Sequence, residues 1–268
     1  MAYTVDNPVV ETGQQPQEPA AALSQSEAPP RRSFLSAIQW ITYVIVITIF
    51  VMTFVVQAFQ IPSESMENTL LIGDYLLVNK VQYGQRGLWG EVLPYEPVKR
   101  GDIIVFKWPV HPEEHFVKRV VGVPGDRIHL VNGHVMVNGE RMKDDYAIYK
   151  RSAHDQFRDE FPTRGIFSPL MTRSWWTDIP LLLRNGDLLV PEDSYFVLGD
   201  NRNESLDSRY WGLVPRENIV GKPLFIYFSL KKPDMAPPAG DDKLTRVANV
   251  MTHLPSLARW HRSFMFVK

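Results

Sequence analysis

The sequence contains no cysteine, and several other features that define function classes are also missing. Without cysteine the chain cannot form disulfides, thiolate zinc sites or a cysteine nucleophile. The formal net charge is only −1 and no basic stripe stands out, so the composition does not favour nucleic-acid binding. Phosphate-binding loops and dinucleotide fingerprints are absent, and the histidines show no close metal-ligand spacing. We therefore expect no cofactor, no metal and no nucleic acid.

Charge is also missing from a long N-terminal run, since no charged residue occurs between Ser33 and Ser63. Within it, residues 34–59 are strongly apolar, and about 20 such residues are enough to cross a membrane. A buried helix of a soluble protein is one alternative. A cleaved signal peptide is another, because residues 56–58 read VQA, but the apolar run is longer than a signal peptide requires. We expect an uncleaved signal anchor, and self-cleavage at VQA is a separate hypothesis.

The charges around this segment predict its direction. Arg31 and Arg32 precede it directly, and no lysine or arginine follows until Lys80. By the positive-inside rule the N-terminus lies in the cytoplasm, and the chain after about residue 60 lies across the membrane. Residues 1–33 are rich in Pro, Gln, Glu and Ala, which predicts a disordered cytoplasmic tail.

Beyond Leu70 the pattern changes to short runs of Val, Ile, Phe and Tyr separated by Gly, Pro, Asn and Asp. This pattern predicts a mainly β domain over residues 60–232, an antiparallel barrel or sandwich. The dipeptides Asn132-Gly133 and Asn138-Gly139 predict the turns of successive hairpins.

Two segments depart from the β pattern. Residues 143–185 are polar and irregular with scattered aromatics, which indicates an inserted cap on the β core. Residues 233–268 form a C-terminal tail. Its apolar runs are too short to span a membrane, and they fit either a short surface or interfacial helix or an ordinary packed tail.

The first candidates for chemistry are Ser63 and Ser65, which follow the apolar segment in QIPSESMENTL. The chain has no G-x-S-x-G and no H-E-x-x-H, so neither of the common hydrolase signatures applies. A serine nucleophile still requires a base.

A lysine can be that base if burial keeps it neutral. Strand alternation over residues 115–123 places Lys118 between Phe116 and Val120 on one face, although an edge position would let its amine reach water. Lys80 and Lys107 have comparable apolar neighbours, and alternation does not choose among the three lysines.

A third stretch, LGDNRNESLDSRYWGLVP at residues 198–215, packs Gly, Asp, Asn, Arg and Ser between two predicted strands. It fits a hydrogen-bonded turn with an Asp207–Arg209 ion pair. Polar loops on a rigid β scaffold are also common places for functional sites.

Three stretches of the sequence, taken in order, resemble type I signal peptidase, the bacterial leader peptidase of the peptidase S26 family. They are IPSESMENTL, GDIIVF…HFVKRVVGVPGD and LGDNRNESLDSRYWG. The resemblance covers about residues 59–228. It implies a membrane-anchored serine endopeptidase that removes signal peptides from exported preproteins. The implied location is the bacterial inner membrane, single-pass, with the catalytic domain on the outer face. The implied partners are preproteins, membrane lipid and nearby export machinery.

The resemblance also implies a role for individual side chains. The catalytic and supporting groups would be the nucleophile Ser65, the base Lys118, the oxyanion donor Ser63, the lysine-orienting Ser205 and the structural ion pair Asp207–Arg209. The walls of the substrate pockets would be Phe59, Ile61, Met66, Leu70 and Val117.

Two positions depart from the family pattern. Glu64 stands where glycine is frequent, and Asn68 stands where proline is frequent. A carboxylate pointing inward would favour the protonated form of Lys118, so we expect Glu64 to face water. Two other functions are compatible with the sequence, a membrane-anchored β binding module and an endopeptidase of the same fold for pilins or other surface proteins.

Overall fold

The computed structural model describes residues 34–83, 96–163, 165–231 and 256–267. The predicted N-terminal tail and most of the C-terminal tail lie outside these residues. The chain divides into two units, Met1–Val44 and Ile45–Lys268, and the division falls within the first helix.

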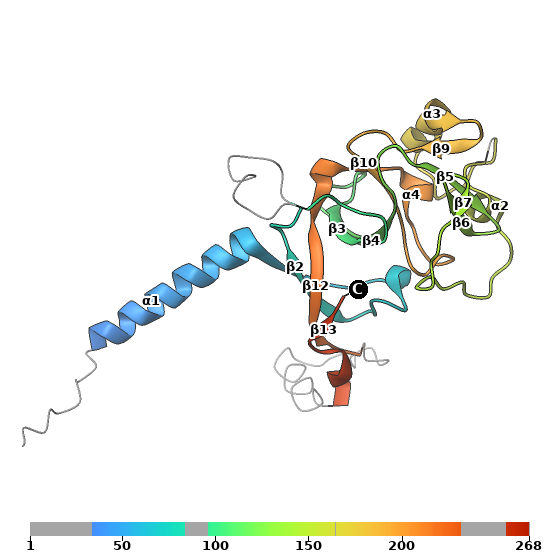
Figure 1. Ribbon diagram of the computed structural model, residues 1–268. Coiled ribbons are helices and arrows are strands. Elements are labelled where there is room, and N and C mark those ends of the chain that lie inside the picture. The colour runs from blue at the N-terminus through green and yellow to red at the C-terminus, as the bar shows by residue number, and fades with distance from the viewer. Residues whose placement is uncertain (1–33, 84–95, 164, 232–255, 268) are drawn as a thin grey trace, which may run out of the picture. The chain divides into compact units, whose positions relative to one another are not determined.

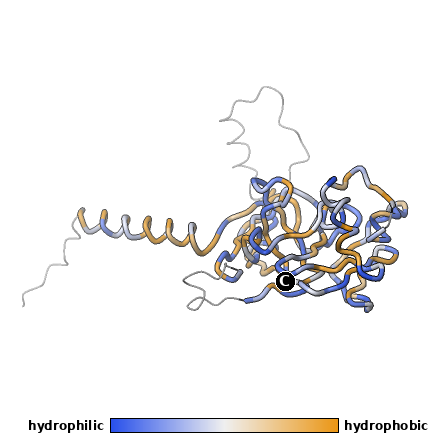
Figure 2. The backbone as a smooth tube through the Cα atoms, turned by 90° about the horizontal axis from the view of Figure 1, so that it is seen from above, coloured by the Kyte–Doolittle hydropathy of each residue, from blue (hydrophilic) through white to orange (hydrophobic). Residues whose placement is uncertain are grey.

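The first helix, α1 (Phe34–Phe50), continues into a π-helical turn, η1 (Val51–Val55). Within the described residues, Leu35–Val55 is the one helical segment long and apolar enough to cross a membrane. Apolar residues predominate along it (Figure 2). The helix ends before residue 59, where the predicted anchor ends, because Val56–Gln60 is extended as β1 and pairs with β2 (Asp74–Asn79).

The larger sheet is antiparallel throughout, and its strands follow the order β1-β2-β12-β3-β4-β10-β11 (Figure 1). A short strand near the C-terminus, β13 (Met265–Phe266), also pairs with β12. The remaining strands of this sheet are β3 (Ile103–Lys107), β4 (His115–Gly122), β10 (Ser194–Leu198), β11 (Val214–Pro215) and β12 (Ile219–Ser229).

A second antiparallel sheet has the order β7-β6-β5-β9-β8. Its strands are β5 (Arg127–Val131), β6 (His134–Val137), β7 (Glu140–Arg141), β8 (Leu183–Arg184) and β9 (Asp187–Leu189). The predicted hairpins are confirmed, since Asn132-Gly133 joins β5 to β6 and Asn138-Gly139 joins β6 to β7. All four turn residues have positive φ, as two-residue hairpin turns of this type require. The mainly β, antiparallel fold class is therefore confirmed.

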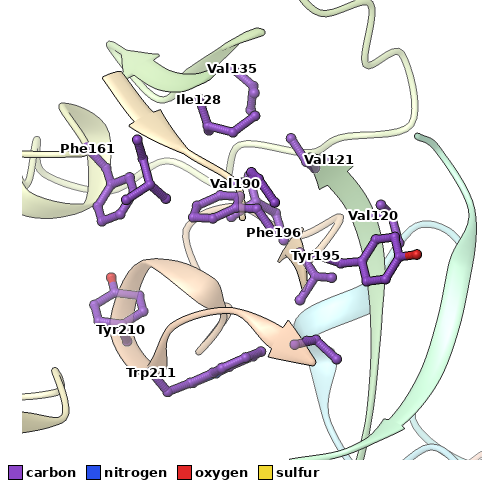
Figure 3. Packing of buried hydrophobic residues seen from close by; sticks show 14 of the residues in the cluster. Val120, Val121, Ile128, Val135, Phe161, Val190, Tyr195, Phe196, Tyr210 and Trp211 are labelled. Atoms are coloured by element: carbon purple, nitrogen blue, oxygen red, sulfur yellow. The ribbon is translucent and has the colours of Figure 1, made fainter. Parts of the chain in front are cut away.

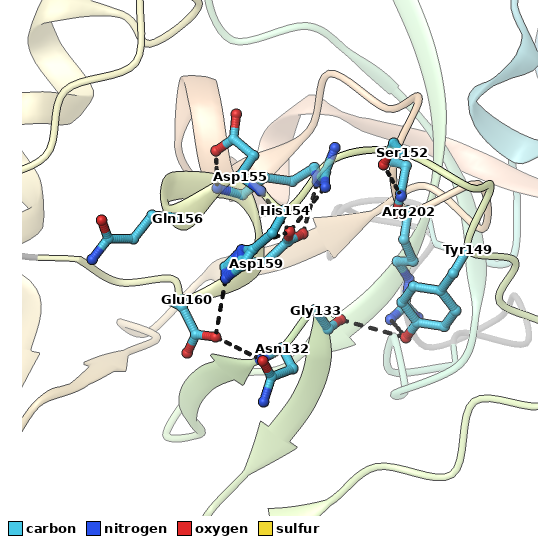
Figure 4. A network of polar contacts seen from close by, with 12 residues as sticks. Asn132, Gly133, Tyr149, Ser152, His154, Asp155, Gln156, Asp159, Glu160 and Arg202 are labelled. Carbon is cyan, nitrogen blue, oxygen red and sulfur yellow. Dashed lines mark hydrogen bonds and ion pairs between the residues drawn. The ribbon is translucent and has the colours of Figure 1, made fainter.

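Short helical elements complete the fold. They are η2 (Glu64–Met66), α2 (Gln156–Asp159), α3 (Arg173–Leu182), α4 (Ser208–Trp211), η3 (Arg216–Asn218) and η4 (Trp260–Arg262). The stretch predicted as a cap contains α2, α3 and β8, and polar contacts tie it to the β5–β6 turn (Figure 4). Asn132 N donates to Glu160 Oε1 at 2.9 Å, and Tyr149 Oη donates to the Gly133 carbonyl at 3.4 Å.

Buried apolar side chains form two clusters. The larger one joins both sheets, with Val120, Ile128 and Phe196 fully buried (Figure 3). The smaller one includes Ile61 and Met66, which flank Ser65. Full burial of such side chains contributes about 1.5–3 kcal/mol each. The turn that carries Ser65 is thus packed into the core.

Candidate active site

Ser65 lies in a tight turn between β1 and β2. Ser63 is extended, with φ −130° and ψ 160°, and the 3-10 turn Glu64–Met66 follows it. The turn is closed at its base, where Ile61 N donates to the Asp74 carbonyl and Gly73 N donates to the Ile61 carbonyl, both at 2.9 Å. Ser65 is only 7% exposed.

Lys118 of β4 is the side chain that meets Ser65. Its Nζ lies 2.6 Å from Ser65 Oγ, and the side chain is 4% exposed. The other two lysines of the sequence prediction differ. Lys80 is half-buried and donates to the Thr53 carbonyl, and Lys107 is exposed. The structure therefore distinguishes Lys118, which strand alternation alone did not.

The surroundings of Lys118 favour its neutral form. Burial lowers the pKa of Lys118 to about 8. The carboxylates of Asp207 and Asp200 act in the opposite direction and favour the ammonium, whereas the Arg209 guanidinium also lowers the pKa of Lys118. A lysine in water has a pKa near 10.4.

The two other serines lie close to this pair. Ser63 Oγ is 3.3 Å from Ser65 Oγ. Ser205 is 7% exposed, and its Oγ has no hydrogen-bond partner among the described residues, Lys118 included. Ser205 Oγ and the Ser65 carbonyl oxygen both lie so close to Gly199 that a Cβ there would overlap them. Glycine at this position lets the polar stretch of residues 198–215, which we call the late loop, approach the Ser65 turn.

The predicted ion pair of the late loop is fully buried. Arg209 donates from Nε and Nη2 to the two oxygens of Asp207, both at 2.8 Å. Arg209 Nη2 also donates to the Arg202 carbonyl, and Asp207 accepts from Gly199 N. A bidentate pair of this kind fixes the relative orientation of the two side chains and also balances their charges. Here the pair holds the loop of Gly199 and Ser205 and offsets the effect of Asp207 on Lys118.

A second buried ion pair was not predicted from the sequence. Arg119 donates from Nε and Nη2 to Asp200, at 2.8 and 2.7 Å, and its guanidinium lies 3.9 Å above the Tyr146 ring. Asp200 also accepts from Thr69 Oγ1, four residues after Ser65. The next residue, Asn201, donates its backbone N–H to the Ser65 carbonyl at 3.1 Å. These contacts join β4, the late loop and the turn of Ser65.

A cavity of about 490 Å³ opens beside the Ser65–Lys118 pair. Four of the predicted pocket residues line it, namely Phe59, Ile61, Met66 and Val117. The fifth, Leu70, is completely buried in the smaller core cluster and is absent from the lining. Glu114 and Glu204 also line the cavity, and the sequence prediction missed both. Neither lies in an apolar run that would have identified it.

Glu64 faces water, as expected. Its side chain is 55% exposed and pairs with Lys150 Nζ at 2.9 Å, and Lys150 also pairs with Glu67 at 2.7 Å. These carboxylates raise the pKa of Lys150. The charge of Glu64 is therefore compensated from the cap, away from Lys118. Asn68 has φ +89° and donates from Nδ2 to the Tyr146 carbonyl.

The arrangement can support acyl transfer. A serine hydroxyl lies within hydrogen-bonding distance of an amine whose pKa is lowered to about 8 by burial, which is the geometry of an activated nucleophile. A second hydroxyl and an apolar-walled cavity adjoin the pair.

Comparisons with known proteins identify relatives of this chain. The family model described as "Signal peptidase, peptidase S26" matches residues 34–228. The signal peptidase I of Aquifex aeolicus is 36% identical, over 72% of this chain and 84% of its own. The signal peptidase I of Leptolyngbya laminosa is 32% identical, over 89% and 98%. A crystal structure of a signal peptidase I from Enterococcus faecalis V583 is 28% identical, covering 47% of this chain and 97% of its own, with a TM-score of 0.35.

Proposed function

The chain belongs to the signal peptidase family, peptidase S26, and from this membership and the geometry of the site we propose that it is a membrane-anchored serine endopeptidase with a Ser65–Lys118 dyad. Its substrates are preproteins with N-terminal signal peptides. The observation that carries the proposal is the 2.6 Å contact between two buried groups, Lys118 Nζ and Ser65 Oγ.

The reaction has two steps. In acylation, neutral Lys118 accepts the proton of Ser65 Oγ as this oxygen attacks the scissile carbonyl carbon. The C–N bond then breaks, and the Lys118 ammonium gives the proton to the leaving amine, which becomes the new N-terminus. In deacylation, Lys118 accepts a proton from water, the hydroxide oxygen attacks the ester carbon, and the proton returns to Ser65 Oγ. The signal peptide leaves with a new carboxyl group.

Charge that develops on the carbonyl oxygen requires donors. The proposed donors are the Ser63 hydroxyl and the Ser65 backbone N–H. The position of Ser63 Oγ, 3.3 Å from Ser65 Oγ, supports this role, because a donor there can reach the oxygen of a carbonyl bonded to Ser65.

Ser63→Ala is expected to lower kcat by about 10²–10³-fold with little change in KM, since a lost oxyanion donor costs about 2.7–4 kcal/mol in the barrier. Steady-state cleavage of a preprotein checks this. Ser63→Thr keeps a hydroxyl and is the matched control, expected to retain most activity. A kcat for Ser63→Ala within twofold of wild type excludes Ser63 as the donor.

Ser205 is proposed to orient the amine of Lys118. The buried hydroxyl without a partner among the described residues supports this role. A neutral hydroxyl can hold the amine without raising its pKa, whereas a carboxylate in the same place favours the ammonium.

The substrate is proposed to bind as an extended strand beside Ser65. The edge of β4 that faces β10 is only partly paired. Leu198 of β10 pairs with Arg119, and among the described residues the preceding part of β4, residues 115–118, has no partner strand at this edge. A peptide added to this edge would pass the cavity and present alternate side chains to its walls. The family resemblance implies small residues, often alanine, at one and three positions before the cut.

The anchor and the topology are also proposals. They are supported by the apolar span Leu35–Val55 and by the arginines that precede it. Residues 60–232, including the cap at 143–185, would then form the catalytic domain on the outer face of the inner membrane, near lipid and the export machinery. Protease added to intact spheroplasts should digest this domain. Self-cleavage at VQA requires opening of β1, in which residues 56–58 pair with β2.

The proposed function is tested with the full-length protein in lipid vesicles and a radiolabelled preprotein. We expect a shortened product whose first residue follows a small residue of the signal peptide, and covalent labelling of Ser65 by a serine-acylating inhibitor. Absence of both would favour a binding module, and cleavage confined to pilin-like precursors would favour the other endopeptidase class.

A further inference from the structure

The described end of the chain, residues 256–267, folds back against the turn that carries Ser65. β13 pairs with β12, with Met265 opposite Ile226 and Phe266 opposite Phe225. Val267 packs on the apolar cluster that contains Met66. We call residues 256–267 the C-terminal brace.

Arg262 of the brace enters a buried site at the base of this turn. Its Nη2 donates to Asp74 Oδ2 at 2.6 Å, and its Nε lies 3.3 Å from Asp74 Oδ1. The same Nη2 donates to the Thr69 carbonyl at 3.0 Å. Asp74 is completely buried and Arg262 is 8% exposed. One guanidinium thus joins the start of β2 to the chain four residues after Ser65.

The two groups that Arg262 holds are both parts of the Ser65 turn. Thr69 N and Leu70 N donate to the Met66 carbonyl, which closes the chain immediately after Ser65. The Asp74 carboxylate accepts from Leu71 N at 2.8 Å, and the Asp74 carbonyl accepts from Ile61 N on the other side of the turn. A shift of Thr69 or Asp74 is therefore transmitted to Ser65 through a few backbone bonds.

The charge of Asp74 depends on this contact. Burial alone would raise the pKa of Asp74, but hydrogen bonds from Arg262, Ser229 and Leu71 N hold it below the ordinary value. Arg259 closes the site from a second direction, since it donates to the Ser229 hydroxyl and to the Ile72 carbonyl. Gly73 lets the Leu230 carbonyl, which accepts from Arg259 Nη2, come close to the turn, because a Cβ at residue 73 would overlap this carbonyl.

From these contacts we propose that the C-terminal brace positions the catalytic serine, and that Arg262 is a positioning residue for the acylation step. The proposal rests on the proposed function, in which Ser65 is the nucleophile. Arg262 touches neither substrate nor Ser65. It fixes Thr69 and Asp74, and through them the direction of Ser65 Oγ relative to Lys118 Nζ.

The test compares Arg262→Gln with His261→Ala in the full-length protein. His261 lies in the same turn and is exposed, so its replacement is the matched control and should leave activity unchanged. Arg262→Gln is expected to lower kcat about 10- to 100-fold with KM nearly unchanged, the size of effect that a displacement near 1 Å produces. The rate at which a small serine-acylating inhibitor labels Ser65 should fall by the same factor.

A second variant separates positioning from loss of charge balance. Asp74→Asn combined with Arg262→Gln removes both members of the closest ion pair. Arg259, whose Nη2 lies 3.7 Å from Asp74 Oδ1, keeps its hydrogen bonds to Ser229, Ile72 and Leu230, so the melting temperature should recover relative to Arg262→Gln alone. The Thr69 carbonyl still lacks its donor, so labelling of Ser65 should stay slow. If labelling recovers together with the melting temperature, Arg262 only balances charge and the proposal is overturned.

The outcomes also distinguish this proposal from the proposed function. If Ser65 is not labelled in the wild-type protein or in His261→Ala, the proposed function fails. If both are labelled and Arg262→Gln matches them, the proposed function stands and the brace does not position Ser65.

Discussion

Replacing Ser65 with alanine is expected to abolish preprotein cleavage while leaving the fold intact. In the proposed mechanism this hydroxyl attacks the scissile carbonyl, and no other described hydroxyl lies as close to Lys118 Nζ. Loss of the nucleophile of a serine protease lowers kcat by roughly 10⁶-fold, so the remaining rate should lie near the assay background. Cleavage of a labelled preprotein in vesicles measures it.

The matched control for this variant is Ser174→Ala. Ser174 is an exposed residue of α3, outside the lining of the proposed substrate cavity, and its replacement should leave kcat and KM unchanged. Melting temperatures of both variants should stay close to that of the wild type. Substantial cleavage by Ser65→Ala, at a tenth of the wild-type rate or more, would mean that another group is the nucleophile.

Lys118→Met is expected to cause a loss of similar size, because it removes the proposed base and keeps a side chain of comparable length. Without an acceptor for its proton, Ser65 is a weak nucleophile. The variant should fold at least as stably as the wild type, since Lys118 is buried and its charged form is disfavoured there. Lys118→Arg should also be inactive, because a guanidinium stays protonated.

Lys107→Met is the matched control for this second prediction. Lys107 was an equal candidate from strand alternation, but it is exposed at the end of β3. Its replacement should leave cleavage unchanged. The assignment of the base would be wrong if Lys118→Met kept its activity and Lys107→Met lost it.

The β architecture was predictable because its signals are local. Alternating apolar residues and the Asn-Gly turns specify hairpins within a few residues, and the hairpins at Asn132 and Asn138 are present. The apolar run continues to residue 59, but the helix ends at Val55 and Val56–Gln60 forms a strand. Val56, Ala58 and Phe59 are compatible with either structure. Only pairing with β2, a contact between distant parts of the sequence, makes them a strand.

The candidate site was likewise only partly predictable from local sequence patterns. Alternation indicated that Lys118 could be buried, but the choice among three lysines came from resemblance to a family. Burial against Ser65 now supports that choice in physical terms. The ion pairs Arg119–Asp200 and Arg262–Asp74 join residues far apart in the sequence, and a local sequence pattern cannot predict such partners. Lys150, which compensates Glu64, was hidden for the same reason.

The most direct test of the dyad is the pH dependence of kcat/KM for the wild-type protein. The substrate should be a signal-bearing peptide with no group that titrates between about pH 5 and 10. Because kcat/KM reports ionisations of the free enzyme, it should follow the fraction of neutral Lys118. With the pKa of Lys118 lowered to about 8, activity should be low in acid and rise about tenfold per pH unit. It should then level off above pH 8, and a flat profile from about pH 5 to 9 would contradict a lysine base.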